Sequence, residues 1–420
     1  MTTELMLMAI AACVLLSYWF SYLARVLRFP SVVFLIFTGL ALRQVTDATG
    51  HTVGLPQGLL PLLGTIGLIM IVLEGALDLD LQPGRRGFLL RTLSSAIVGV
   101  ALMTAVLGAA ISAVLDLPLL HAAMMATPFA VISSAVAIPS SEVLPRAERE
   151  FVIHESSWSD IFGVMLLNAL VAAADDGGFA RSLLVGGFAV VLLGAILGLA
   201  MVWLVGHLQG HVKFLPLIFA LLLVYGAAKA LQLSPLLIVL VLGLMLNNRH
   251  LILRFALLRR LDSDHYEVEL GKLKHLTAEA TFLVRTFFFL LLGYSTDTAH
   301  LIDPWSWIVA IAIVLMAFGL RVPVLHWLAA RPTRPLVWVA PRGLVTVLLF
   351  FSLPAGLVPE RFPPGVLILV VLLSCTVMAI GLLHDGRRKG ADAAEPAAAP
   401  AAGDAGAAVS ADEGIAGPPP

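Results

Sequence analysis

The sequence predicts an all-α membrane protein of about 13 transmembrane helices, built from two inverted-topology repeats with interrupted helices. Three observations predict this fold: the composition, the distribution of basic residues, and motifs that recur in both halves of the chain. Of the 420 residues, 60% are hydrophobic and 13% are charged, whereas soluble proteins contain about 45–50% apolar and about 25% charged residues. A soluble protein of this size could not bury so much apolar surface in one core. The apolar runs do not alternate with polar residues, which favours helices over a membrane β-barrel.

The helices are placed where uncharged apolar runs approach or exceed the roughly 18 residues that signal a membrane span. The first run is expected to be a retained helix, because residues 1–16 hold Glu4 and lack the basic start of a cleaved signal peptide. The run at 182–206 lies between the two repeats and is expected to be a linker helix. The predicted spans cover residues 5–24, 30–43, 59–77, 88–114, 119–140, 151–173, 182–206, 213–230, 234–248, 277–295, 305–329, 336–355 and 364–384.

The remaining segments are connectors and a tail. The charged loop 250–275 is predicted to join spans 9 and 10 on the cytoplasmic side. Residues 387–420 are rich in Ala, Pro and Gly, which cannot build a core, so we predict a disordered cytoplasmic tail. A transmembrane domain is therefore expected at 1–386, with repeat one at about 5–173 and repeat two at about 213–384.

Lysine and arginine residues orient the chain, because cytoplasmic loops hold an excess of them. With the N-terminus outside, the inner loops and the C-terminus hold nineteen of the 26 basic residues, and three lie within spans. The outer loops hold four: Arg43, Arg181, Lys229 and Arg361. This asymmetry predicts an outside N-terminus, a cytoplasmic C-terminus and an odd number of spans.

Charge and cysteine content exclude several classes of function. The net charge of −1 argues against nucleic acid as a partner, since no basic domain exists to neutralise phosphates. Cys13 and Cys375 both lie in apolar segments, so neither a disulfide framework nor a metal cluster is expected. An intramembrane hydrolase is disfavoured, because His154 is only two and three residues from Ser156 and Ser157 and no oxyanion loop is apparent. We therefore expect no enzyme activity, no catalytic residue and no cofactor.

Matching motifs recur in the two halves of the chain. Spans 2 and 9 both begin with a Pro/Ser pair and end in Gly-Leu-x-Leu followed by a polar residue. Span 3 ends Leu73-Glu-Gly-Ala-Leu-Asp78, and span 10 ends Leu292-Gly-Tyr-Ser-Thr-Asp297. Spans 5 and 12 carry Pro128 and Pro341 inside their apolar runs. The offset of seven spans is odd, so the second copy would run through the membrane upside down, a pattern of secondary transporters.

Ionisable residues at membrane depth are costly and therefore usually functional. The five candidates are Glu74, Glu155, Asp160, Arg285 and Arg342. Arg321 lies nearer the inner end of span 11, where its side chain could snorkel to the interface, so a structural role is favoured there.

Asp160 is the principal candidate, about ten residues into span 6. Ser156 and Ser157 precede it by four and three residues, so both hydroxyls would flank the carboxylate on a helix. These hard oxygen ligands suit a hard cation. Burial disfavours the charged carboxylate, so protons and cations would compete for it near neutral pH.

Two further features of the intramembrane residues are expected. Glu155 lies off the face of Asp160 and needs a cationic partner, for which Arg342 is the candidate, chiefly in a structural role. Thr127-Pro128 in span 5 is expected to interrupt the helix and free backbone carbonyls near the membrane centre. These carbonyls could point at an ion, although a simple packing kink explains the proline equally well.

The motifs together resemble the monovalent cation:proton antiporter family, the sodium/proton exchangers, over nearly the whole chain up to about residue 385. The residues that carry the resemblance are Arg28-Phe-Pro-Ser31 with Gly39, Leu73–Leu81, Ala126-Thr-Pro-Phe-Ala-Val131, Glu155-Ser-Ser-Trp-Ser-Asp160, Arg285 with Phe287–Phe289 and Gly293, and Pro341-Arg-Gly-Leu-Val345. Glu155, Ser156 and Asp160 match the Glu-Ser-x-x-Asn-Asp pattern of the electroneutral branch.

The resemblance implies a sodium/proton antiporter-like fold and roles for individual residues. Asp160 would bind the cation or proton and is the only metal ligand expected, for the transported monovalent cation alone. Ser156, Thr127 and Glu74 would contribute further oxygens, and we add Ser159 to this cation-binding set. Glu155 and Arg342 would form a stabilising ion pair, and Arg285 would hold the core helices.

Two positions depart from the family pattern. Ser159 stands where the electroneutral branch usually has Asn and the electrogenic branch Asp, and Pro128 follows Thr127 directly where Asp is usual. With a single obligate carboxylate, one cation exchanged for one proton is the natural expectation.

The sequence therefore predicts a secondary transporter that exchanges Na⁺ or K⁺ for protons by alternating access, with a role in pH homeostasis. The expected surroundings are a lipid bilayer, the cell (inner) membrane, and a homodimer by family inference. Two alternatives stay open: a non-transporting membrane sensor or scaffold of the same fold, and a Na⁺-coupled symporter of organic solutes.

Overall fold

The computed structural model describes residues 3–27, 29–49, 59–79, 81, 85–176, 187–207, 214–230, 235–248, 266–329 and 334–394. Helices make up nearly all of these residues, which contain no strand. Several predictions fall outside this part of the chain: Arg28, residues 182–186 of the linker helix, residues 250–265 of the charged loop, and residues 395–420 of the tail.

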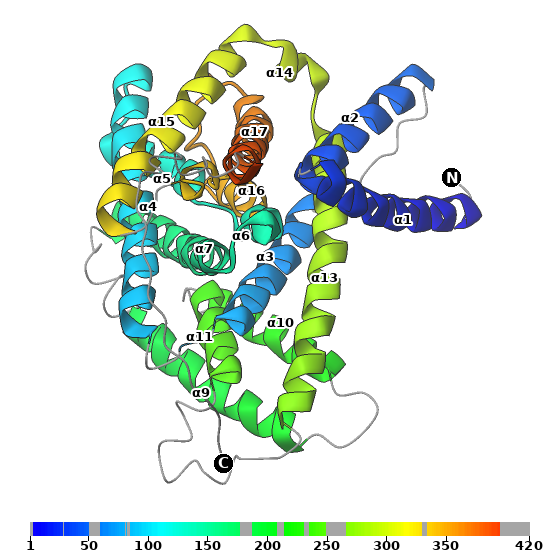
Figure 1. Cartoon of the computed structure of the whole chain (residues 1–420), viewed down its shortest axis with the longest axis vertical. Helices are drawn as coiled ribbons and strands as arrows, with labels where there is room; N and C mark the ends of the chain where they lie inside the picture. Colours follow the sequence, from blue (N-terminus) through cyan, green and yellow to red (C-terminus); the bar gives the residue numbers. More distant parts are fainter. Residues whose placement is uncertain are drawn as a thin grey trace, which may run out of the picture.

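The first half of the chain contains the helices α1 (Thr3–Leu27), α2 (Ser31–Thr49), α3 (Leu59–Asp78), α4 (Arg86–Leu115), α5 (Leu119–Ala130), α6 (Ser134–Ser140) and α7 (Arg146–Asp176), with a 3-10 turn, η2, at Ser141–Val143. The second half contains α9 (Gly187–His207), α10 (Phe214–Ala230), α11 (Pro235–Asn247), α13 (Tyr266–Ser295), α14 (Thr298–Ile302), α15 (Pro304–Leu328), η5 (Leu336–Trp338), α16 (Leu344–Phe351) and α17 (Val366–Ala394). Figure 1 shows their arrangement.

Every predicted span coincides with a helix or with a pair of short helices. Seven helical segments are long and apolar enough to cross a membrane, with α5, α6 and η2 together forming one of them. Shorter apolar helical segments lie within α1, α9, α10 and α11. The chain is a multi-pass membrane protein, while the count of thirteen crossings stays a prediction.

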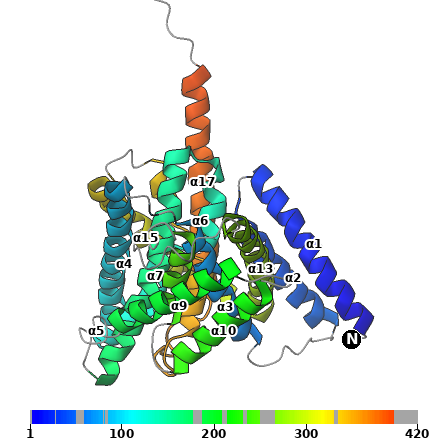
Figure 2. The same ribbon diagram turned by 90° about the horizontal axis from the view of Figure 1, so that it is seen from below.

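Several helix boundaries differ from the predicted ones. α7 begins at Arg146 rather than 151, and α13 begins at Tyr266 rather than 277. α17 continues to Ala394, so residues 387–394 are helical instead of disordered as expected. Figure 2 shows α17 projecting beyond the other helices. Hydropathy marks the apolar part of a helix, whereas Glu, Lys, Arg and Ala extend it into polar sequence because their helix propensity is high.

The helices pack as two bundles. The α13 bundle consists of α1, α2, α3, α9, α10, α11 and α13, and the α7 bundle consists of α4, α5, α6, α7, α15, η5, α16 and α17. Within each bundle the helices contact one another extensively, and α3 provides most of the contact between them through α16, α7 and α6.

The inverted repeat is visible in the helix packing of the α13 bundle. α2 packs on α13, and its repeat counterpart α11 packs on α3, the counterpart of α13. Glycines permit both close approaches. A Cβ at Gly39 would meet the backbone oxygen of Leu290, and one at Gly293 would meet that of Ile36. A Cβ at Gly243, which occupies the position of Gly39 in the second repeat, would lie 2.6 Å from the side-chain Cβ of Ala76. The two-repeat fold is therefore confirmed.

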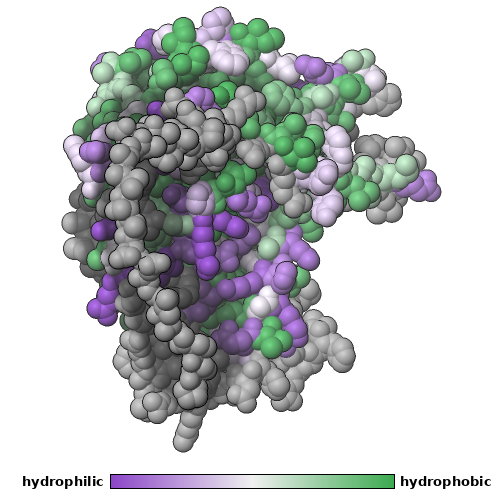
Figure 3. All heavy atoms as spheres, in the orientation of Figure 1, coloured by the Kyte–Doolittle hydropathy of each residue, from purple (hydrophilic) through white to green (hydrophobic). Residues whose placement is uncertain are grey.

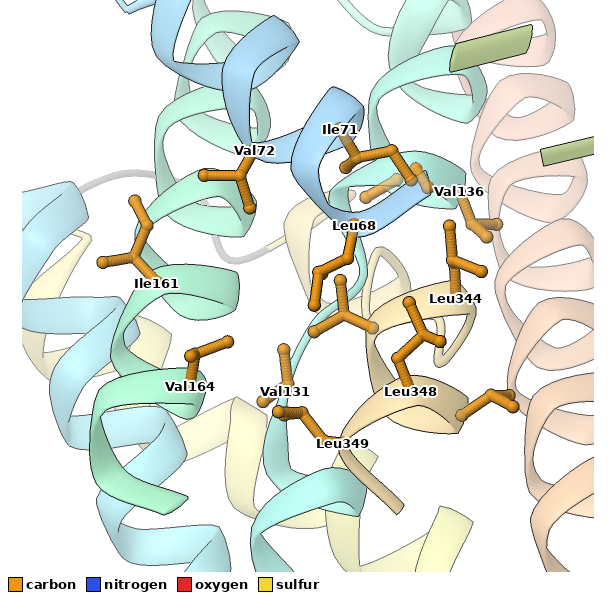
Figure 4. Packing of buried hydrophobic residues seen from close by; sticks show 14 of the residues in the cluster. Leu68, Ile71, Val72, Val131, Val136, Ile161, Val164, Leu344, Leu348 and Leu349 are labelled. Atoms are coloured by element: carbon orange, nitrogen blue, oxygen red, sulfur yellow. The ribbon is translucent and has the colours of Figure 1, made fainter. Parts of the chain in front are cut away.

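The interrupted helices of the two repeats cross in the middle of the α7 bundle. Residues 131–133 are non-helical between α5 and α6, and residues 339–343 separate η5 from α16. The backbone N–H of Ser133 donates to the carbonyl oxygen of Pro341 across the crossing, at 3.0 Å. Gly343 fits there because a Cβ would lie only 2.7 Å from the Ser133 hydroxyl oxygen. Figure 4 shows apolar side chains of α3, α7 and α16 around this point, among them Leu68 and Leu348.

The predicted position of the first interruption was wrong. Thr127 and Pro128 lie inside α5, and the helix ends only at Ala130. The Thr127 hydroxyl donates to its own helix at the Ala123 oxygen, 2.8 Å away. Proline removes one hydrogen bond from the ladder but does not end the helix here. The interruption lies where the N–H groups of residues 132–134 find partners outside the helix.

Candidate functional site

Asp160 lies at the centre of the α7 bundle, where α7 passes the first interruption. Its side chain is buried, with 3% of the residue exposed. One carboxylate oxygen, Oδ2, accepts the backbone N–H of Ser134 at 3.2 Å, and the Ser134 hydroxyl lies beside the same carboxylate. The other oxygen, Oδ1, has no hydrogen-bond partner among the described residues. Buried polar atoms are usually hydrogen-bonded, so Oδ1 is available for a cation or a proton.

Ser159, the residue before Asp160, also hydrogen-bonds to the interrupted segment. The Ser159 hydroxyl oxygen accepts the N–H of Ile132 at 2.9 Å. The N–H groups of Ile132, Ser133 and Ser134 therefore bond to Ser159, Pro341 and Asp160 respectively. Three successive backbone donors that the broken helix leaves without an intrahelical partner are thereby satisfied.

The other predicted hydroxyl ligands bond to their own helices. Ser156 donates to the Val152 oxygen at 2.7 Å and Ser157 to the Ile153 oxygen at 2.8 Å. Such back-bonding is usual for hydroxyls inside helices, and it leaves the oxygen lone pairs able to coordinate an ion. Within the described chain no hydrogen bond joins Ser156, Ser157 or Thr127 to Asp160.

Glu155 pairs with Arg321 rather than with Arg342, which corrects the sequence prediction. The two Nη atoms of Arg321 donate to the two carboxylate oxygens of Glu155 at 2.7 and 3.2 Å. The Ser95 hydroxyl adds a third bond to Glu155 at 2.6 Å. Arg321 is only 5% exposed, so it does not snorkel as its position in the sequence suggested. α15 packs closely on α4 and α17, and the Arg321 side chain points inward from α15 toward Glu155 of α7.

Arg342 instead bonds to backbone carbonyls at the crossing. Its Nε donates to the oxygen of Phe129 at 2.7 Å, and its Nη atoms reach those of Ala340 and Ala130 at 2.9 and 3.5 Å. Phe129 and Ala130 end α5, whose last carbonyls carry partial negative charge. The buried guanidinium therefore stabilises the end of the broken helix, and the sequence could not show this because carbonyl partners have no sequence signature.

Arg285 joins the two bundles. Its Nη1 on α13 donates to the carbonyl oxygen of Ala135 in α6 at 3.0 Å. Glu74 of α3 interacts electrostatically with Arg285 and through a hydrogen bond with Thr281. Glu74, a predicted cation ligand, is thus placed beside Arg285, and no hydrogen bond of the described residues links it to Asp160.

Comparison with known proteins identifies the family. The family model described as "Sodium/hydrogen exchanger, transmembrane" matches residues 10–383. The chain belongs to the sodium/hydrogen exchanger family. It is 24% identical over 375 residues to the K(+)/H(+) antiporter NhaP2 of Shewanella sp. (strain ANA-3), a match that covers 84% of this chain and 62% of the relative. The NhaP2 of Shewanella oneidensis is 25% identical over 378 residues, with the same coverage. The chain therefore spans less than two thirds of the length of these curated relatives.

The fold is also that of a solved sodium proton antiporter. The sodium proton antiporter MjNhaP1 from Methanocaldococcus jannaschii, at pH 8, superposes with a TM-score of 0.69 and 18% identity, over 90% of this chain and 100% of that one. A second MjNhaP1 structure, from an electron microscopy map, gives a TM-score of 0.63 and 17% identity over 93% and 97% of the two chains.

Two cavities adjoin the site in this exchanger-family chain. The larger, of about 880 Å³, lies between α1, α2 and α13 on one side and α6 and α17 on the other, and both Arg285 and Ala135 line it. Glu142 and Glu279 contribute carboxylates to its wall. A small cavity of about 30 Å³ lies behind the crossing, beside Ser159 and Arg342. Figure 3 shows hydrophilic side chains gathered toward the middle of one face of the molecule.

Sequence reasoning missed Ser133 and Ser134. Ser134 supplies both an N–H and a hydroxyl beside Asp160, and the Ser133 hydroxyl is fully buried with no hydrogen-bond partner in the described structure. A serine directly before an apolar helical run is an N-cap signal, so the pair could have marked the start of α6. No group of three or more His, Cys, Asp or Glu residues that could hold a metal ion occurs in the described part of the chain.

Proposed function

We propose that this protein exchanges a monovalent cation, Na⁺ or K⁺, for protons across the membrane by alternating access. One observation carries the proposal: Asp160 is a buried carboxylate at the crossing of two interrupted helices, with one oxygen free of hydrogen bonds among the described residues. A proton and a cation would compete for this oxygen. Because one carboxylate neutralises one positive charge, exchange would be one cation for one proton and electroneutral.

The proposed cation ligands are oxygens around Asp160. Asp160 supplies the charged oxygen, and Ser156, Thr127 and Glu74 of the predicted set supply neutral or secondary ones. The Ser159 oxygen already accepts the Ile132 N–H and is not counted among them. The position of Ser134 beside the carboxylate favours its hydroxyl as an addition to this set. Hydroxyl and carboxylate oxygens suit hard cations, which is why the site would take an alkali cation.

The large cavity is the proposed access route. It separates the two bundles and reaches Ala135, one residue beyond the Ser134 N–H that holds Asp160. The predicted orientation, with the C-terminus in the cytoplasm, places this cavity on the cytoplasmic side of a cell (inner) membrane. Movement of the α7 bundle against the α13 bundle would close this route and open another on the opposite side.

A homodimer is proposed on family grounds. α1 presents Tyr18, Trp19 and Tyr22 on its surface with more than half of each exposed. Such aromatic residues suit contact with lipid or with a second copy of the chain. Cross-linking between cysteines introduced into α1, carried out in membranes, would distinguish the two.

Transport by the purified protein in liposomes tests the proposal. A pH-sensitive dye inside the vesicles should report proton movement when Na⁺ or K⁺ is added, at several pH values, with Li⁺ as a further probe. Absence of a pH change with all three cations would contradict the proposal and favour the sensor or scaffold alternative. Na⁺-driven uptake of an organic solute without proton countermovement would favour the symporter alternative.

A further inference from the structure

The three residues of the first interruption are held in an alternating pattern. In an extended chain, successive backbone groups point to opposite sides. Accordingly, the N–H groups of Ile132 and Ser134 both reach α7, while the N–H of Ser133 between them reaches Pro341 on the other interrupted helix. Two adjacent residues of α7, Ser159 and Asp160, therefore hold two alternate donors of one short segment.

Asp160 makes two interactions that compete with each other. It holds the Ser134 N–H with Oδ2, and in the proposed function it also binds the cation or the proton. Hydrogen bonds to a charged acceptor are roughly twice as strong as those between neutral groups. Loading the carboxylate with a cation or a proton lowers the charge on its oxygens and so weakens its hold on Ser134.

Ser159 has no such conflict, because its hydroxyl carries no charge and does not titrate. Its bond to the Ile132 N–H persists whichever ion Asp160 carries. We propose that Ser159 is a positioning residue, which keeps the interruption in place while Asp160 changes its partner. This inference rests on the proposed function, and it differs from a role of Ser159 as a cation ligand.

Without the Ser159 hydroxyl, the Ile132 N–H has no partner, and Asp160 is the only residue of α7 whose hydrogen bond still holds the described segment. A cation that binds Asp160 must then weaken the one remaining hydrogen bond from α7 to the interruption. The consequence is a weaker apparent cation affinity at a preserved maximal rate, because the transport cycle itself keeps all its charged groups.

The matched pair Ser159→Thr and Ser159→Val tests the proposal, since Thr and Val share a shape and differ in the hydroxyl. In liposomes, Ser159→Val should raise the cation concentration for half-maximal exchange roughly tenfold, the effect expected from one lost hydrogen bond. Its maximal rate should stay within about twofold of wild type, and Ser159→Thr should behave like wild type. Ser159→Ala removes the hydroxyl without β-branching and should reproduce the loss of affinity.

Thr376→Val is the control, because among the described residues the Thr376 hydroxyl bonds only to its own helix, at the Leu372 oxygen. It should leave both the affinity and the rate unchanged. Equal half-saturation for Ser159→Val and Ser159→Thr would overturn the inference while leaving cation:proton exchange intact. A wild-type protein without exchange would overturn the proposed function itself.

Discussion

Glu155 of α7 and Arg321 of α15 form a two-pronged ion pair inside the α7 bundle, with N–O distances of 2.7 and 3.2 Å. Both residues are at most 5% exposed. Removing one partner of a buried pair leaves an uncompensated charge, which costs about 3–5 kcal/mol. We therefore expect Arg321→Gln to destabilise the protein by this amount, measured as the shift in the unfolding transition of purified protein in detergent.

A double-mutant cycle distinguishes the Glu155–Arg321 pair of the structure from the Glu155–Arg342 pair that the sequence suggests. Glu155→Gln and Arg321→Gln should show a large coupling energy, because each substitution removes the same interaction. Glu155→Gln and Arg342→Gln should be close to additive. Strong coupling to Arg342 with additivity at Arg321 would contradict the structure. The exposed Arg43–Asp47 pair is a useful reference, since surface ion pairs contribute about 0–1 kcal/mol.

The crossing of α2 and α13 depends on the absence of side chains at Gly39 and Gly293. A Cβ at Gly39 would overlap the backbone oxygen of Leu290 and lie 2.8 Å from the Tyr294 nitrogen. Gly39→Ala should therefore force the helices apart and destabilise the protein by about 1–3 kcal/mol. Gly319→Ala in α15 is the control, because nothing lies within 4 Å of its added Cβ. Equal thermal stability of the two variants would contradict the observed packing.

Stability should depend on pH through Asp303, which caps α15 just outside the membrane-spanning segment. Its carboxylate accepts the Ser306 hydroxyl and the N–H groups of Ser306 and Trp305, and these bonds hold its pKa below the usual value. A carboxyl with a folded-state pKa below its unfolded value contributes stability above the unfolded pKa of about 3.9. This contribution is lost as the pH falls through the folded pKa.

The stability difference between wild type and Asp303→Ala should accordingly be constant near neutral pH and disappear in acid. Unfolding of both proteins over a series of pH values measures this difference. A difference that persists unchanged in strong acid would show that the carboxylate does not act through its charge.

Chemical labelling tests the access route and the orientation together. In a background with Cys13→Ser and Cys375→Ser, the substitution Ser140→Cys places a thiol on the wall of the large cavity. A membrane-impermeant thiol reagent should modify it from the cytoplasmic side only. Arg361→Cys, in an exposed segment predicted to lie outside, should react from the other side only. Labelling of both thiols from the same side would contradict the predicted orientation.

The sequence predicted the large-scale organisation well, because hydropathy and residue spacing determine where the helices lie and how they pack. Apolar runs located the helices, and the glycines at positions 39, 243 and 293 lie at the close helix contacts of both repeats. The ends of α13 and α17 were misplaced because helix propensity continues beyond the apolar run.

Local details of the site were harder to predict, because they depend on backbone groups and on side-chain direction. The prediction placed the interruption at Pro128, which lies inside α5. The actual break lies where backbone N–H groups donate to Ser159, Pro341 and Asp160. Hydropathy likewise could not show that Arg321 turns inward to Glu155 or that Arg342 binds carbonyls. Asp160 was identified because a carboxylate inside a long apolar span is rare.

Exchange by the Asp160→Asn variant is the most direct test of the account. Asn keeps the size of the side chain and an oxygen for the Ser134 N–H, but it cannot release a proton or neutralise a cation. In liposomes, the Thr376→Val control should exchange Na⁺ or K⁺ for protons like wild type, and Asp160→Asn should show no cation-driven proton movement. Undiminished exchange by a correctly folded Asp160→Asn protein would contradict the central claim.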